Sequence, residues 1–139
     1  MAFWIYKCND NGKFNKGDWD YLFEQSSPTR WGNTEWTRPR GKLQVGDVVI
    51  AHQTDRKELV GLAEVTGFKR RGAGEDIMLL PIEEIRVKVP RIRECDRRIN
   101  ELEVWKAGPI KTIYDITTAD ACHLLRVARA LAALEDACG

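Results

Sequence analysis

Short apolar runs separated by polar turns organise much of the chain. Aromatic and β-branched residues dominate the first run, and the later runs are either continuously apolar or alternate with period two, as half-buried strands do. The strands expected from these runs are 3–8, 48–52, 59–65, 78–82, 85–89 and 110–116. The polar turn at 53–57 predicts a hairpin between two of them.

Helical periodicity occupies the remaining segments. Asp18 is placed to cap a helix in which Trp19, Leu22 and Phe23 share one face, and 96–102 predicts a second short helix. Thr117 is expected to cap the final helix, whose apolar stripe is Leu124, Val127, Ala128, Leu131 and Leu134. The segment 29–42 is expected to be a polar loop.

This order of elements predicts a single α+β (mixed) domain over residues 1–139. The strands follow one another without long intervening helices, which favours a curved, largely antiparallel sheet or open β-barrel flanked by helices over a Rossmann fold.

Composition narrows the class of protein. A chain of 139 residues with 43% hydrophobic and 31% charged residues has the profile of a globular domain, and its apolar runs are far too short for a membrane span. The start of the chain does not resemble a signal peptide. The four cysteines, Cys8, Cys95, Cys122 and Cys138, lack metal-ligand spacing. We therefore expect a cytoplasmic protein with reduced, mostly buried thiols, no metal and no cofactor.

Charge is informative through its distribution. The net charge is only +1, whereas proteins that coat nucleic acid usually carry a large basic excess. Basic residues nevertheless gather locally, which is equally compatible with a solvated surface and with local docking on phosphates. The residues expected to contact phosphates are Arg30, Arg38, Arg40, Lys69, Arg70 and Arg71.

Residues suited to catalysis are scarce. His52 closes a strand at a turn and is a better site candidate than His123, which lies among apolar neighbours of the last helix. Adjacent Glu83 and Glu84 point to opposite faces of a strand, so they cannot act as a carboxylate pair. No nucleophile elbow, phosphate loop or zinc-protease motif occurs, and we expect a non-catalytic domain.

Two tryptophans, Trp31 and Trp36, lie in the hydrophilic segment 30–38 and belong to no apolar run. Either indole could fold back onto the core, or it could form a platform on which a nucleobase stacks. Gly32 would let the backbone approach a ligand closely, and Asn33 could read the edge of a base.

Several motifs together resemble the EVE domain, a member of the PUA-like superfamily. The opening Phe3-Trp4-Ile5-Tyr6-Lys7-Cys8-Asn9 is similar to its aromatic first strand, which runs into a Lys-Ser motif, and Trp31-Gly32-Asn33 resembles its tryptophan loop. Val45-Gly46-Asp47 is similar to its V-G-D strand entry, and Gly61-Leu62-Ala63-Glu64-Val65 to its G-[IL]-A-E-V strand. Their order and spacing extend over most of the chain.

The resemblance implies a pocket that accepts one modified base flipped out of nucleic acid. The expected ligand is a modified cytosine such as 5-methylcytosine, in DNA rather than RNA, with a partner nuclease and no membrane. Trp31 matches the cage tryptophan, and Cys8 replaces the usual serine hydroxyl. The second aromatic wall is open between Trp36, Trp105 and Tyr6. The implied pocket residues are Trp31, Lys7, Cys8, Asn9, Asn33, Trp36, Tyr6, His52 and Gln53.

Three alternatives stand beside this interpretation. The same motifs resemble the YTH domain, which reads methylated adenine in RNA. A general RNA-binding barrel without preference for modified bases is the second. The third is an enzyme on the related ASCH-type barrel that acts on a modified nucleoside through Lys7 and Glu64.

Overall fold

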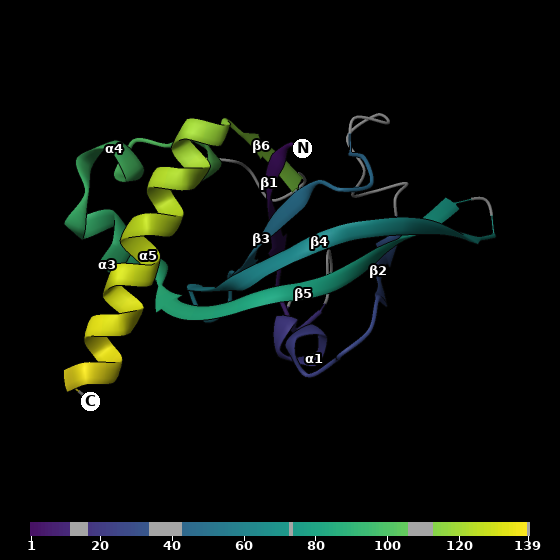
Figure 1. Ribbon diagram of the computed structural model, residues 1–139, viewed down its shortest axis with the longest axis horizontal. Coiled ribbons are helices and arrows are strands. Elements are labelled where there is room, and N and C mark those ends of the chain that lie inside the picture. Colours follow the sequence, from purple (N-terminus) through teal and green to yellow (C-terminus); the bar gives the residue numbers. More distant parts are fainter. Residues whose placement is uncertain (12–16, 34–42, 73, 106–112, 139) are drawn as a thin grey trace.

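The computed structural model describes residues 1–11, 17–33, 43–72, 74–105 and 113–138, without the side chains of Asn33 and Arg71. Its centre is a six-stranded sheet in the order β2-β5-β4-β3-β1-β6 (Figure 1). The strands are β1 (Phe3–Cys8), β2 (Thr29–Asn33), β3 (Val48–Gln53), β4 (Glu58–Arg71), β5 (Gly74–Lys88) and β6 (Ile113–Ile116). Among the strand pairs of the described residues, only β1–β3 is parallel, and the β3–β4 hairpin is confirmed. The mixed, mostly antiparallel fold is therefore as predicted, and the sheet stays open rather than closing into a barrel.

Long, bent strands replace several of the predicted short ones. The two runs expected at 78–82 and 85–89 form one strand, β5, and β4 runs on to Arg71, so that their hairpin extends far beyond the other strands (Figure 1). Register shifts interrupt the β4–β5 ladder near Gly61, Ala63 and Gly67. Such bulges bend a pair of strands without ending it, which explains why the break expected at Glu83 and Glu84 does not separate two strands.

The loop expected at 29–42 begins with a strand instead. Thr29–Asn33 pairs with β5, and its register shifts between Trp31 and Asn33, where Gly32 adopts a φ of 72°. A left-handed residue at a bulge suits glycine, which has no Cβ to clash. Gly32 therefore shapes the edge strand that carries Trp31.

Two hydrophobic cores lie on opposite faces of the sheet. Because side chains alternate along a strand, β1 sends Phe3 and Ile5 to one face and Trp4, Tyr6 and Cys8 to the other. We call the first the helix face, because α3, α4 and α5 pack on it, and the second the α1 face. Lys7 follows Ile5 in this alternation and points to the helix face.

The helices follow the predicted capping only in part. Asp18 caps α1 (Trp19–Phe23), and the Thr117 hydroxyl accepts a hydrogen bond from the Asp120 amide at the start of α5 (Thr118–Cys138). Sequence periodicity missed α3 (Val89–Cys95), whose second residue is Pro90, a residue suited to a first helical turn. The predicted helix at 96–102 is limited to α4 (Arg97–Asn100), and the 3-10 turn η1 (Glu103–Trp105) follows it.

Two details of burial differ from expectation. Cys8 is buried, but Cys95, Cys122 and Cys138 are exposed, because the first lies in a central strand and the others lie on helix surfaces. Leu134, expected in the core stripe of the last helix, is 51% exposed, since α5 extends beyond the sheet at that point (Figure 1). Among the described residues, no helix combines the length and the apolar character needed to cross a bilayer.

Candidate functional site

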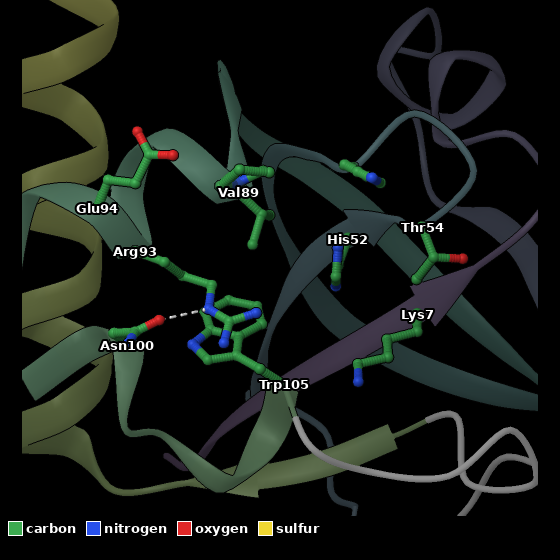
Figure 2. Close-up of a pocket in the computed structure, with 10 residues that line it drawn as sticks. Lys7, His52, Thr54, Val89, Arg93, Glu94, Asn100 and Trp105 are labelled. Atoms are coloured by element: carbon green, nitrogen blue, oxygen red, sulfur yellow. Dashed lines mark hydrogen bonds between the residues drawn. The ribbon is translucent and has the colours of Figure 1, made fainter. Parts of the chain in front are cut away.

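A pocket of about 480 Å³ opens on the helix face, where β1 and β3 end against α3 and η1. Figure 2 shows Lys7 and His52 on the strand side of this pocket and Arg93, Asn100 and Trp105 across from them. The lining residues are Lys7, His52, Thr54, Lys57, Val89, Pro90, Arg93, Glu94, Asn100 and Trp105. We call this space the Trp105 pocket.

Lys7 is the innermost cation of the Trp105 pocket. It pairs in register with His52 on the neighbouring parallel strand, and its Nζ donates a hydrogen bond to the Val104 carbonyl. The ammonium also lies 4.5 Å from the centre of the Tyr114 ring. Partial burial lowers the pKa of Lys7, and no carboxylate pairs with it within the described part of the chain. Its charge is therefore compensated only by neutral groups.

His52 lies beside Lys7 and is only 9% exposed. Burial, and then the nearby charge of Lys7, lower the pKa of its imidazole to about 4, so the ring is neutral at pH 7. Its Nδ1 atom is buried and finds no hydrogen-bond partner among the residues described. A neutral imidazole with an unused ring nitrogen is suited to bonding a polar ligand.

Trp105 forms the aromatic wall. Its indole Nε1 donates to the Ile99 carbonyl at 2.7 Å, which fixes the ring, and His52 meets it edge to face with 5.6 Å between ring centres. The Arg93 guanidinium lies 5.9 Å from the centre of the Trp105 ring, and its Nε donates to Asn100 Oδ1 at 2.9 Å. The Arg93 group is thus held over an indole that is only half buried.

The rest of the lining is mostly hydrogen-bond donors. Lys57 and Arg93 add two cations to that of Lys7, while Glu94 is the one carboxylate among the lining residues. The Asn100 oxygen is already bonded to Arg93, so its amide N–H groups are the part left for a ligand. Val89 and Pro90 supply an apolar patch. The pocket is therefore suited to a flat ligand that carries acceptor atoms or negative charge.

The predicted cage tryptophan, Trp31, lies on the α1 face, away from the Trp105 pocket. It is 8% exposed and stacks on Trp19, with ring centres 4.4 Å apart and planes inclined by 19°. Its indole therefore belongs to the core cluster of that face. Stacking of Trp31 on a base stays a prediction, and Trp36, in the segment 34–42, lies outside the described residues.

Three more predicted pocket residues share the α1 face with Trp31. Tyr6 packs edge to face on Trp19, and Cys8 is buried, which raises the pKa of its thiol to about 12 and keeps it protonated. Gln53 is fully buried and accepts from the Trp19 amide, while its Nε2 donates to the Gly17 carbonyl and Asp55 Oδ1. Both amide protons of Gln53 are used in anchoring α1, so none is left to read a base.

The other predicted residues are dispersed. Asn9 caps the turn after β1 by accepting from the Asn11 amide, and the side chain of Asn33 is not described. Arg30 is 56% exposed and lies 3.9 Å from Asp76. Lys69 and Arg70 are exposed near the end of the β4–β5 hairpin, which Arg71 also reaches, whereas Arg38 and Arg40 fall outside the described residues.

The basic end of the hairpin is remote from the pocket. His52 pairs with Leu59 on β4, and Lys69 follows ten residues later, a separation of about 30 Å along an extended strand. One base-sized ligand cannot contact both places. Lys7 and Glu64, the pair required by the enzyme alternative, are also apart, because Glu64 pairs with Val48 and Lys7 pairs with His52, about 13 Å along β3.

Sequence reasoning found Lys7 and His52 and left Trp105 open as an aromatic wall, but it missed the α3 side of the pocket. Arg93 and Glu94 lie in α3, a short helix that the sequence pattern did not reveal, whereas Asn100 lies in the predicted helix at 96–102 but was not recognised as a pocket residue. The available signal was Trp105 itself, an indole between charged residues, like the tryptophans of segment 30–38.

Comparison with known proteins extends only to the fold. No protein-family model and no curated protein sequence matches this chain. Among solved structures, a crystal structure of a protein from Agrobacterium tumefaciens is 11% identical, with a TM-score of 0.71 over 92% of this chain and 93% of that one. A hypothetical protein from Leishmania major is 15% identical, with a TM-score of 0.72 over 94% and 96%. An NMR structure of a Rhodopseudomonas palustris protein is 14% identical, with a TM-score of 0.69 over 94% and 95%.

Proposed function

We propose that this protein binds nucleic acid without catalysis and holds one base, displaced from its stack, in the Trp105 pocket. The observation that carries the proposal is the half-buried Trp105 indole in a pocket lined mainly by hydrogen-bond donors and cations. An aromatic face with positive groups around it is the usual arrangement for holding a base and its phosphate.

Stacking would come from Trp105. Its ring is fixed by the bond to Ile99 and is partly accessible, so a base could lie on it without first breaking the core. Arg93 already lies over the same indole, and guanidinium groups stack on bases as well as on aromatic rings. Because the guanidinium is only 5.9 Å from the ring centre, a base that stacks on Trp105 would displace Arg93 from the indole and could then contact its guanidinium.

Polar recognition would come from the strand side. His52 offers a buried, unpartnered ring nitrogen, and Lys7 offers an ammonium with further donor capacity beyond its bond to Val104. Lys57 is exposed at the pocket and is suited to a flanking phosphate. In the proposed complex, Lys7, His52 and Trp105 contact the base, and Trp31 does not.

The resemblance to EVE domains supports a more specific form of the proposal. In that form the polymer is DNA, the base is a modified cytosine, the protein acts in the cytoplasm, and a nuclease is a partner. Displacing the base from its stack costs a few kcal/mol, which the pocket must offset.

The test compares two tryptophan variants. Fluorescence anisotropy of labelled single-stranded and duplex oligonucleotides measures the Kd of wild type, Trp105→Ala and Trp31→Phe. We expect Trp105→Ala to weaken binding by about tenfold or more, the contribution of one stacked base. Trp31→Phe retains an aromatic ring against Trp19 and should bind like wild type.

Two results would contradict this assignment. If a folded Trp105→Ala variant, checked by circular dichroism, binds as tightly as wild type, the base does not bind in the Trp105 pocket. If only Trp31→Phe loses binding, the base binds on the α1 face, beside Trp31. Oligonucleotides of RNA and DNA in the same assay separate the proposal from a general RNA-binding barrel.

A further inference from the structure

Among the described residues, no anion is paired with Lys7 in the Trp105 pocket. Lys7 is half buried, its ammonium bonds the Val104 carbonyl and faces the Tyr114 ring, and within the described residues it forms no ion pair. Charged groups removed from water are normally compensated by a partner of opposite charge. In this protein the space beside Lys7 is a pocket open to ligands, so the missing partner can arrive from outside.

The groups next to Lys7 do not supply that partner. His52, its neighbour in register, is buried with an unbonded Nδ1, and Thr54 donates its hydroxyl to the Cys8 carbonyl. Across the pocket, Asn100 turns its oxygen to Arg93. Glu94 is exposed on α3 and forms no ion pair with Lys7.

We propose that Lys7 is a specificity-determining residue that selects bases whose substituent carries acceptor oxygens and negative charge, such as a carboxylate, over bases with a methyl group. The inference rests on the proposed function and names the class of base that the pocket prefers. In the bound state the carboxylate pairs with the Lys7 ammonium and accepts from His52, while the ring of the base stacks on Trp105.

A methyl substituent offers much less to this pocket. It makes no hydrogen bond, and it would leave the Lys7 charge and the His52 nitrogen uncompensated beneath the ligand. A carboxylate at the same position gains a charge-assisted bond, which is among the stronger hydrogen bonds in proteins. The apolar side chains of Val89 and Pro90 then contact the ring of the base.

The experiment uses three duplexes that differ at one central cytosine, which is unmodified, 5-methylated or 5-carboxylated. Their Kd values for the 139-residue chain are measured at one salt concentration. We expect the carboxylated duplex to bind about ten- to a hundredfold more tightly than the methylated one, the range of a charge-assisted hydrogen bond. Lys7→Met should reduce this ratio to near one, because methionine keeps the apolar stem and removes the charge.

Lys88→Met is the matched control. Lys88 is an exposed lysine that bonds the Arg56 carbonyl and does not line the pocket, so its loss should leave the ratio unchanged. Lys7→Arg, which keeps the charge, should retain a preference for the carboxylate. Circular dichroism melting of each variant shows whether it folds. If Lys7→Met does not fold, the ratio of the wild-type Kd values for the methylated and carboxylated duplexes still tests the preference.

The possible failures are distinguishable. Equal binding of the three duplexes, with binding still lost in Trp105→Ala, would overturn the role of Lys7 and leave the proposed function standing. A carboxylate preference that persists in a folded Lys7→Met would assign selection to another residue. If the protein binds none of the duplexes and single strands, the proposed function is contradicted, and so is this inference.

Discussion

Trp31 stacks face to face on Trp19, with 4.4 Å between ring centres, and this pair joins the edge strand β2 to helix α1. Neither residue is more than 8% exposed. The indole that most suggested a ligand platform in the sequence is therefore part of the core that holds α1 against the sheet. Its substitution has a structural cost that any binding experiment must take into account.

Trp31→Ala should destabilise the protein. Removing a buried indole leaves a cavity against Trp19, and truncations of this size lower the free energy of unfolding by about 3–5 kcal/mol. Urea denaturation followed by circular dichroism measures the change, with Trp105→Ala as the comparison, since that ring is only half buried. Equal stability of Trp31→Ala and wild type would show that the stack does not contribute to the core.

Asp47 should be essential to the N-terminal strand. Its carboxylate is 4% exposed and accepts from the Trp4 indole, the Ala2 amide and the Gln44 amide, each at 2.9 Å. Burial alone raises the pKa of a carboxyl, but these bonds outweigh it and the pKa of Asp47 is lowered. Asp47→Ala should cost about 3 kcal/mol in urea denaturation, because three donors, one of them the buried Trp4 indole, lose their acceptor.

The matched variant for this prediction is Trp4→Phe, which removes one of the three bonds and should cost less. A double-mutant cycle with Asp47→Ala then isolates the indole–carboxylate interaction. If the two changes are strictly additive, Asp47 does not stabilise the fold through Trp4.

Gly61 and Gly67 should respond differently to substitution by alanine. A Cβ on Gly61 would collide with the Glu83 carbonyl oxygen and would lie 2.8 Å from the Phe23 ring, whereas a Cβ on Gly67 would meet nothing within 4 Å. Gly61→Ala should therefore lower the free energy of unfolding by about 1–3 kcal/mol or more. Gly67→Ala is the control on the same strand, and a similar loss in both would contradict the close approach of β5 and α1.

His52 should make stability depend on pH. Its pKa is 6.5 when unfolded and about 4 when folded, so between these values the unfolded chain binds more protons. Its contribution is therefore complete above pH 6.5 and is lost as the pH falls toward 4. Between about pH 7.5 and about pH 5, wild type should lose about 2 kcal/mol more than His52→Gln. Parallel urea curves at the two pH values measure the difference, and identical losses would mean that His52 is not buried as a neutral ring.

Local patterns in the sequence predicted much of the fold. The cap at Asp18, the cap at Thr117 and the hairpin between β3 and β4 all depend on residues close together in the chain, and the structure confirms them. The β5 strand was predicted only as two shorter strands, because bulges interrupt the period of a strand without ending it. Helix α3 was not predicted, because a proline in its first turn interrupts the simple period.

The candidate site was predictable only in fragments. The alternation that separates Glu83 from Glu84 also separates Lys7 from Cys8, so a strand that contributes Lys7 to one pocket cannot contribute Cys8 to the same one. The resemblance placed Lys7, Cys8 and Trp31 together as a motif. A sequence motif does not specify which face of the sheet each side chain reaches.

The sequence by itself determined the approximate positions of most strands and of the first and last helices, which side chains are apolar, and that the chain forms a mixed, mostly antiparallel sheet. Only the tertiary structure decided that Trp31 meets Trp19 and that Trp105 meets His52. The reason is physical. Hydrogen bonds and side-chain periods act over a few residues, whereas a pocket forms between segments distant in the chain, and its position depends on how bulges bend the sheet and which helix covers each face.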